Sequence, residues 1–150
     1  MAVARTTRKR IEDSKAKLAN GGDAWLTTAG AKGPHLVPLS LAWDAHQEAI
    51  IFCTEGKNRT THNIAEQPSV QIALGSTRDV LMIHGKATVL GNVNELHPTA
   101  ELFASQVGWD PRGDSDRWVF IHVAPRRMMA WREVNEINGR TIMRHGQWLL

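Results

Sequence analysis

The chain has 150 residues, a length typical of one domain with a substantial core, and its hydrophobic fraction of 42% is ordinary for a globular protein. No apolar stretch approaches the length of a membrane helix, the basic start lacks the apolar middle of a signal peptide, and the single cysteine, Cys53, excludes an intrachain disulfide framework. The net charge is +3. A single cysteine suits a reducing cytoplasm, so we expect one cytoplasmic domain over residues 1–150, and the lack of a long apolar stretch predicts no membrane partner.

The chain opens with a basic arm that leads into a predicted helix over residues 8–19. Arg5, Arg8, Lys9 and Arg10 precede the first acid, and the remaining chain is nearly neutral, with fourteen Lys and Arg against fifteen Asp and Glu. A nucleic-acid interface requires a clustered basic surface with interleaved aromatic side chains. We therefore predict a solvated first helical turn and no nucleic-acid partner.

Hydrophobic periodicity and turn residues then predict many short strands and two further helices. The predicted strands cover residues 24–28, 35–43, 48–54, 69–75, 79–90, 118–123 and 128–131, with the last two joined across Pro125-Arg126. The predicted helices cover residues 60–67 and 94–106, and a terminal hairpin is centred on His145-Gly146. Strands at this spacing with few helices predict a mainly β fold built around a small closed barrel.

The predicted strand over residues 35–43 has two unequal faces. Val37, Leu39, Leu41 and Trp43 form the more apolar face by strict alternation. Pro38 lacks a backbone donor, so this strand is expected at a sheet edge or at a bulge.

The segment CTEGKNRTTHNIAEQP, residues 53–68, joins two apolar runs and contains the start of the short helix. Asn58 or Thr60 can cap that start, because each offers a side-chain acceptor to free backbone N–H groups. A helix start attracts anions, and Lys57 and Arg59 add full charges beside it. These residues fit a phosphate cradle; taken alone, they also fit an ordinary capped helix at the surface.

Other chemical signatures are weak. The seven histidines are scattered and none has metal-ligand spacing, so we predict no metal site. Cys53 lies in an apolar strand and is interpreted as a small buried hydrophobe. No side chain is identified as catalytic, and the strand tryptophans are expected in the core. These are Trp25, Trp43, Trp118 and Trp131.

The order and spacing of several segments resemble the pyridoxamine 5′-phosphate oxidase-like split-barrel family of flavin and deazaflavin proteins. The resemblance extends over residues 23–150 and is closest to actinobacterial members grouped with the coenzyme F420-dependent reductases. The segments that carry it are residues 24–29, 33–40, Thr54, 59–64, 77–80, Gly85, 130–133 and 138–144.

The resemblance implies a split β-barrel of the FMN-binding type and a set of cofactor contacts. Peptide groups of the second strand face the cofactor ring, the third strand ends at a contact to the cofactor tail, and the following turn binds phosphate. The implied residues are Val37, Pro38, Leu39 and Ser40 for the ring, Thr54 for the tail, and Lys57, Asn58, Arg59, Thr60 and Asn63 for the phosphate. Oxidases of the family often have Arg-Lys where this chain has Arg59-Thr60, and their substrate-binding residues are not recognisable here.

The resemblance therefore favours an F420-dependent oxidoreductase over a pyridoxamine phosphate oxidase. Such an enzyme transfers a hydride from reduced deazaflavin to an unsaturated or quinone-like small molecule, and the cofactor carries that chemistry. Two alternatives stay open: an FMN-binding oxidoreductase of the same fold, and a non-catalytic cofactor-binding protein. A homodimer is expected, with each cofactor bound near the subunit boundary.

Overall fold

The computed structural model describes residues 2–150, and their main feature is one curled antiparallel sheet of nine strands. Seven strands follow the order β2-β1-β5-β6-β7-β4-β3, while β8 pairs with β7 and β9 pairs with β8. The strands are β1 (Asp23–Gly30), β2 (Gly33–Ser40), β3 (Ala42–Asp44), β4 (Ala49–Glu55), β5 (Ser69–Leu74), β6 (Val80–Asn92), β7 (Trp118–Trp131), β8 (Thr141–Arg144) and β9 (Gln147–Trp148). The predicted mainly β architecture is confirmed.

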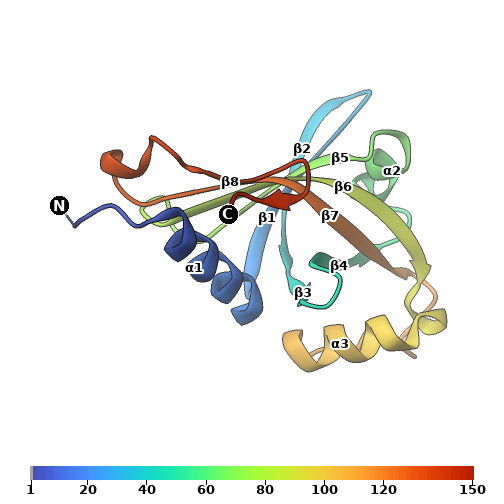
Figure 1. The fold of residues 1–150 in the computed structure, drawn as a ribbon. Helices are drawn as coiled ribbons and strands as arrows, with labels where there is room; N and C mark the ends of the chain where they lie inside the picture. The colour runs from blue at the N-terminus through green and yellow to red at the C-terminus, as the bar shows by residue number, and fades with distance from the viewer. Residues whose placement is uncertain (1) are drawn as a thin grey trace.

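Three helices cover different parts of the sheet. They are α1 (Thr7–Asn20), α2 (Arg59–Glu66) and α3 (His97–Val107), with short 3₁₀ turns η1 (Val93–Glu95) and η2 (Val134–Glu136). Figure 1 shows α1 and α3 below the sheet, whereas α2 lies at the upper right, near the tip of the β1–β2 hairpin. Within residues 2–150, no helix has both the length and the apolarity needed to cross a bilayer.

Two apolar clusters hold these layers together. The larger one joins α1 to the inner face of the sheet and includes Leu18, Leu26, Phe52 and Ile83. The smaller one lies between α3 and the other face of β3, β4 and β7. Burial on both faces explains why β4 reads as a continuous apolar run rather than an alternating one.

The predicted strand over residues 35–43 is divided at Leu41. Residues before it pair with β1, whereas Ala42 and those after it pair with β4. At this point the chain passes from pairing with β1 to pairing with β4, and Leu41 N–H donates to the Gly22 carbonyl at 2.9 Å. The predicted apolar face is confirmed, since Leu41 and Trp43 are buried, and β2 is an edge strand of the sheet, as Pro38 predicted.

The two strands predicted on either side of Pro125-Arg126 are one strand, β7, so the expected break is wrong. The β6–β7 register shifts next to Gly85, which lies opposite Pro125. Because of this irregularity the strands stay paired on both sides of the proline. A Cβ at Gly85 would lie 2.6 Å from a Val123 methyl and 2.8 Å from the Ala124 carbonyl oxygen. Glycine is therefore what permits the close approach of the two strands.

The basic arm is only in part the solvated turn that its sequence suggests, since Arg8 and Lys9 are exposed but Arg5 and Arg10 are bonded inward. Arg10 is buried, and its guanidinium donates to the backbone carbonyls of Ala130, Glu136 and Gly139 at 3.3, 2.9 and 3.0 Å. Arg5 donates to the Glu136 carboxylate at 2.8 Å. A guanidinium has five donors, so it can satisfy several carbonyls of a turn at once.

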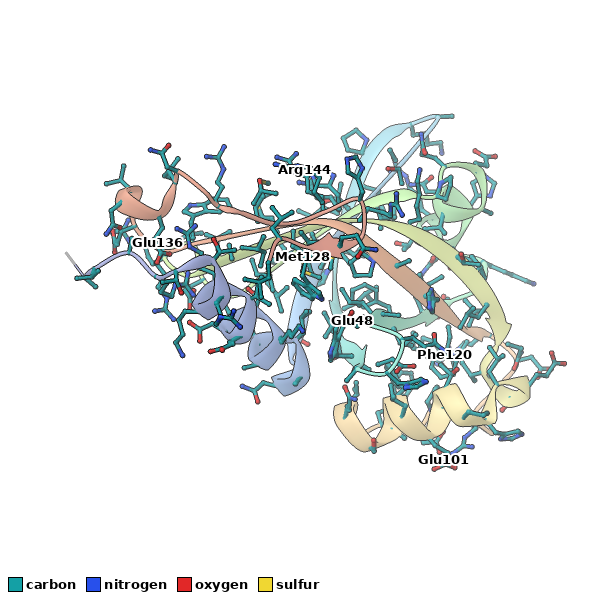
Figure 2. All side chains as sticks on the ribbon, viewed as in Figure 1. Glu48, Glu101, Phe120, Met128, Glu136 and Arg144 are labelled. Atoms are coloured by element: carbon teal, nitrogen blue, oxygen red, sulfur yellow. The ribbon has the colours of Figure 1, made fainter. Side chains whose placement is uncertain are left out.

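Glu136 is the buried acid at the centre of this arrangement, beside α1 in Figure 2. Hydrogen bonds from Arg5 hold the pKa of Glu136 at about 2, although burial acts in the opposite direction. The backbone N–H of Arg132 also donates to this carboxylate, at 2.9 Å. The arm thus fixes the segment after β7 onto α1.

The tryptophans divide between core and surface. Trp43 is buried as predicted, but Trp25 is 52% exposed, so its expected place in the core is wrong. Trp118 and Trp131 are half-buried. Trp25 alternates with buried Ala24 and Leu26, and its side chain therefore lies on the outer face of β1.

Candidate cofactor-binding site

The turn between β4 and α2 is fixed by a chain of short hydrogen bonds. The Asn58 side chain accepts from Thr61 N–H at 3.0 Å and donates to Thr54 Oγ1 at 2.6 Å. Thr61 Oγ1 donates to the Glu55 carbonyl at 2.7 Å. Asn58 is therefore the helix cap, Thr60 is not, and the turn has a defined shape.

A pocket of about 380 Å³ lies between this turn and the β1–β2 turn. Three exposed cations line it: Lys57 and Arg59 from the start of α2, and Lys32 from the hairpin tip. Within residues 2–150 none of the three forms an ion pair. Glu66 also lines the pocket, and its Oε1 lies 3.3 Å from Nε2 of His62 on the same helix. The pocket is therefore suited to an anionic group.

Asn63 also lines the pocket, but its amide is buried and bonded inward. Its Nδ2 donates to Thr28 Oγ1 on β1 at 3.1 Å. The same amide occupies the space in which a side chain at residue 30 would lie, so Gly30 and Asn63 pack directly together. Asn63 joins α2 to the hairpin that carries Lys32.

Two predicted contact residues lie behind the turn rather than in the pocket. Thr54 is 6% exposed and its hydroxyl accepts from Asn58, while Thr60 is 2% exposed. The Thr54 hydroxyl thereby helps to fix the turn that carries Lys57 and Arg59, whereas Thr60 is a buried residue of the first turn of α2.

The four predicted ring-contact residues lie on the edge strand, outside the pocket. Val37 and Leu39 point toward the main core, and Pro38 is exposed opposite Trp25. The Ser40 hydroxyl donates to Asp23 at 3.0 Å. β2 also contacts β4, the strand that leads into the turn before α2.

Sequence reasoning found the α2 side of the pocket and missed the hairpin side. Lys32 and Ala31 lie far from α2 in sequence, and neither is among the residues predicted to bind the cofactor. The available signal was the cluster of glycines around Lys32, which indicated a tight hairpin tip able to approach another element.

Other chemical groups add little to the site. Among residues 2–150, no group of three or more His, Cys, Asp or Glu side chains could hold a metal ion. Cys53 is buried, as predicted, and burial raises the pKa of its thiol to about 12. A thiol with this pKa is protonated at neutral pH and is a poor nucleophile.

Comparisons with known proteins show which family and which fold the chain is similar to. No protein with a curated functional description matches the chain. The General Stress Protein 26 from Bacillus anthracis strain Sterne has a TM-score of 0.65 at 16% identity, over 83% of this chain and 96% of that one. A structure described as F420 Reductase has a TM-score of 0.61 at 21% identity, over 76% of this chain and 94% of that one.

A third structure is a pyridoxamine 5′-phosphate oxidase-related, FMN binding protein from Nostoc punctiforme. Its TM-score is 0.59 at 14% identity, over 83% of this chain and 81% of that chain. At these identities the likenesses establish the fold, a split barrel. The sequence family described as Pyridoxamine 5′-phosphate oxidase matches residues 13–138, and the chain therefore belongs to that family.

Proposed function

We propose that this protein is an F420-dependent reductase that transfers a hydride from reduced deazaflavin to an unsaturated or quinone-like small molecule. The observation that carries the proposal is the convergence of three exposed cations, Lys32, Lys57 and Arg59, on one pocket beside a capped helix start. The similar fold of an F420 reductase supports the choice of cofactor.

The residues present fit a phosphate-bearing cofactor. Arg59 offers a fork of donors that matches phosphate oxygens, and Lys57 offers a mobile point charge. Asn58 holds the turn so that these two side chains leave it on the pocket side. The edge strand is proposed to present peptide groups of residues 37–40 to the ring.

A bound deazaflavin would supply the hydride, so the protein has to bind the cofactor, orient its ring and exclude water from the ring. Thr54 and Asn58 fix the turn, and Val37 and Leu39 anchor the edge strand to the core. Either FMN or F420 would be served by this arrangement. The FMN-binding protein from Nostoc punctiforme supports FMN as the alternative.

We also propose a homodimer with the cofactor near the subunit boundary and a cytoplasmic location. Trp25 and Leu36 are 52% and 58% exposed and lie with Ala73 and Met82 around a hollow of about 330 Å³ on the outer face of the sheet. Exposed apolar surface of this kind typically meets a partner. A second copy of the chain would cover it symmetrically.

The decisive experiment is a side-by-side titration of the purified protein with F420 and FMN, followed by turnover of the reduced cofactor with a panel of conjugated carbonyls and quinones. Tighter binding of F420 together with turnover supports the proposal. Tighter FMN binding would select the flavin alternative. F420 binding without turnover of any acceptor would select a non-catalytic cofactor-binding protein.

A further inference from the structure

A second cavity lies between α3 and the sheet, and it shares no lining residue with the cationic pocket. Its volume is about 450 Å³, within the range of small-molecule sites. Ile51 of β4 belongs to this cavity, whereas the cationic pocket lies beyond the other end of that strand. The two sites therefore lie at opposite ends of β4.

The floor of the cavity is a row of side chains from three adjacent strands. His122 of β7 lies between Ile51 of β4 and Thr88 of β6 in the antiparallel ladders. Phe120, two residues before His122, packs against Phe103 of α3, so alternation places the row on the α3 side of the sheet. Figure 2 shows Phe120 above α3.

The roof is α3, and it is anchored firmly. The Gln106 side chain accepts from Trp43 N–H and donates to the Trp43 carbonyl, both at 2.8 Å. Ala100 and Phe103 are buried against the sheet. Leu96 and Leu102 line the cavity, and Leu90 of β6, which is 38% exposed, also belongs to its lining. A cavity with such fixed walls is already formed before any ligand arrives.

The polar groups of the cavity have the opposite charge preference to the cationic pocket. Asp44 lines it, and its Oδ1 accepts from the N–H groups of His46 and Gln47 at 3.0 and 3.1 Å. Over residues 2–150, Asp44 Oδ2 has no protein donor. The lining holds neither Lys nor Arg. An anionic ligand is therefore disfavoured here, and a donor or a cation is favoured.

We propose that this cavity is a second ligand site, which binds a small amphipathic molecule with an apolar body and a cationic or hydrogen-bond-donating head. The leucines and Ile51 receive the body, and Asp44 receives the head. His122, whose Nε2 lies 3.3 Å from Gln47 Oε1, and Thr88 supply further polar groups in the floor. The proposal concerns residues outside the cationic pocket and does not depend on the cofactor that the protein uses.

The test uses three probes of one shape and different charge: phenethylamine, 2-phenylethanol and phenylacetate. Binding is followed by the NMR signals of the His122 ring, which are assigned by their loss in His122→Gln. We expect the amine and the alcohol to shift these signals and phenylacetate to bind at least tenfold more weakly than the amine. Asp44→Asn is expected to weaken the binding of phenethylamine and to leave the binding of 2-phenylethanol unchanged.

Leu90→Arg and Thr88→Arg place a long side chain at exposed positions of the cavity and are each expected to abolish probe binding. Val134→Arg is the matched control, because Val134 is 72% exposed and does not line the cavity. The proposal is overturned if no probe shifts the His122 signals at millimolar concentration. It is also overturned if phenylacetate binds as well as the amine, or if folded Leu90→Arg and Thr88→Arg proteins bind like the parent.

Discussion

The amide of Asn63 occupies the space that a side chain at Gly30 would need, so helix α2 and the end of strand β1 are in direct contact. The contact ties the two halves of the cationic pocket together, since Lys32 follows Gly30 and Arg59 precedes Asn63 on the helix. The separation of the pocket walls therefore depends on the absence of a Cβ at residue 30.

Gly30→Ala is expected to destabilise the fold by about 1–3 kcal/mol, the usual cost of overpacking a tight contact, and to weaken anion binding at the pocket. Thermal unfolding and cofactor titration measure the two effects. The control is the double variant Gly30→Ala/Asn63→Ala, in which the clash is gone. If its loss of stability equals the sum of the two single losses, the contact is not the cause.

Arg59→Ala is expected to weaken cofactor binding by about 1.5–3 kcal/mol without unfolding the protein, because one charge-assisted contact is lost at an exposed position. Isothermal titration gives the affinity. Arg78→Ala is the matched control, since Arg78 is also exposed but lies outside the pocket. Equal affinities of the two variants would remove Arg59 from the site.

Pro38→Ala distinguishes two roles for the edge-strand proline. If the missing N–H shapes the ring site, the variant stays soluble and its cofactor affinity or turnover falls. If the proline only protects the sheet edge, the variant aggregates and its soluble fraction binds normally. We expect the first result, measured by light scattering and cofactor titration on the same sample. A soluble variant that binds and turns over like the parent would exclude the ring-site role.

Glu136→Gln is expected to lower stability by about 3 kcal/mol at neutral pH, because the half-buried Arg5, which also pairs with Asp13, loses its contact with a buried carboxylate. The pKa of Glu136 is depressed to about 2 from its ordinary value of 4.5, so the stabilisation is present above pH 4.5 and lost as the pH falls toward 2. The free energy of unfolding, measured with urea, should fall with decreasing pH across this range for the parent and change less for Glu136→Gln. Glu95→Gln, at an exposed acid, should keep the parental slope.

Trp25→Glu is expected to convert the proposed dimer into a monomer, because a charge would be buried in the apolar outer face of β1. Sedimentation at micromolar concentration measures the change. Val134→Glu alters another exposed apolar residue outside that face and should leave the dimer intact. A monomeric parent that still binds cofactor tightly would refute the dimer.

Local sequence rules predicted most of the elements but not the partners that distant segments find. The edge position of β2 is one of the two outcomes that Pro38 predicts, and Asn58 is one of the two predicted caps of α2, because both are properties of a few neighbouring residues. Pro125 was misread as a break, since only the opposing glycine at residue 85 shows that the ladder can pass it.

Long-range chemistry explains the remaining errors. The sequence predicts a solvated basic arm, because it does not show that the Glu136 carboxylate and the Gly139 carbonyl lie beside Arg5 and Arg10. Trp25 has the pattern of a strand residue, but the pattern does not say which face is covered. The same limit applies to Lys32, whose place in the pocket depends on how the hairpin meets α2.

The buried Arg10 has a consequence for the order in which the molecule can be assembled. Its guanidinium is bonded to carbonyls that lie 120 to 129 residues further along the chain. During synthesis, helix α1 emerges first, and its Leu18 can pack against early strands, but the Arg10 guanidinium lacks these carbonyls until residues 130–139 have been made. Contacts of such long sequence separation slow folding, because a large loop must close before they form. The ends of the described chain are therefore expected to dock together as a late step of folding.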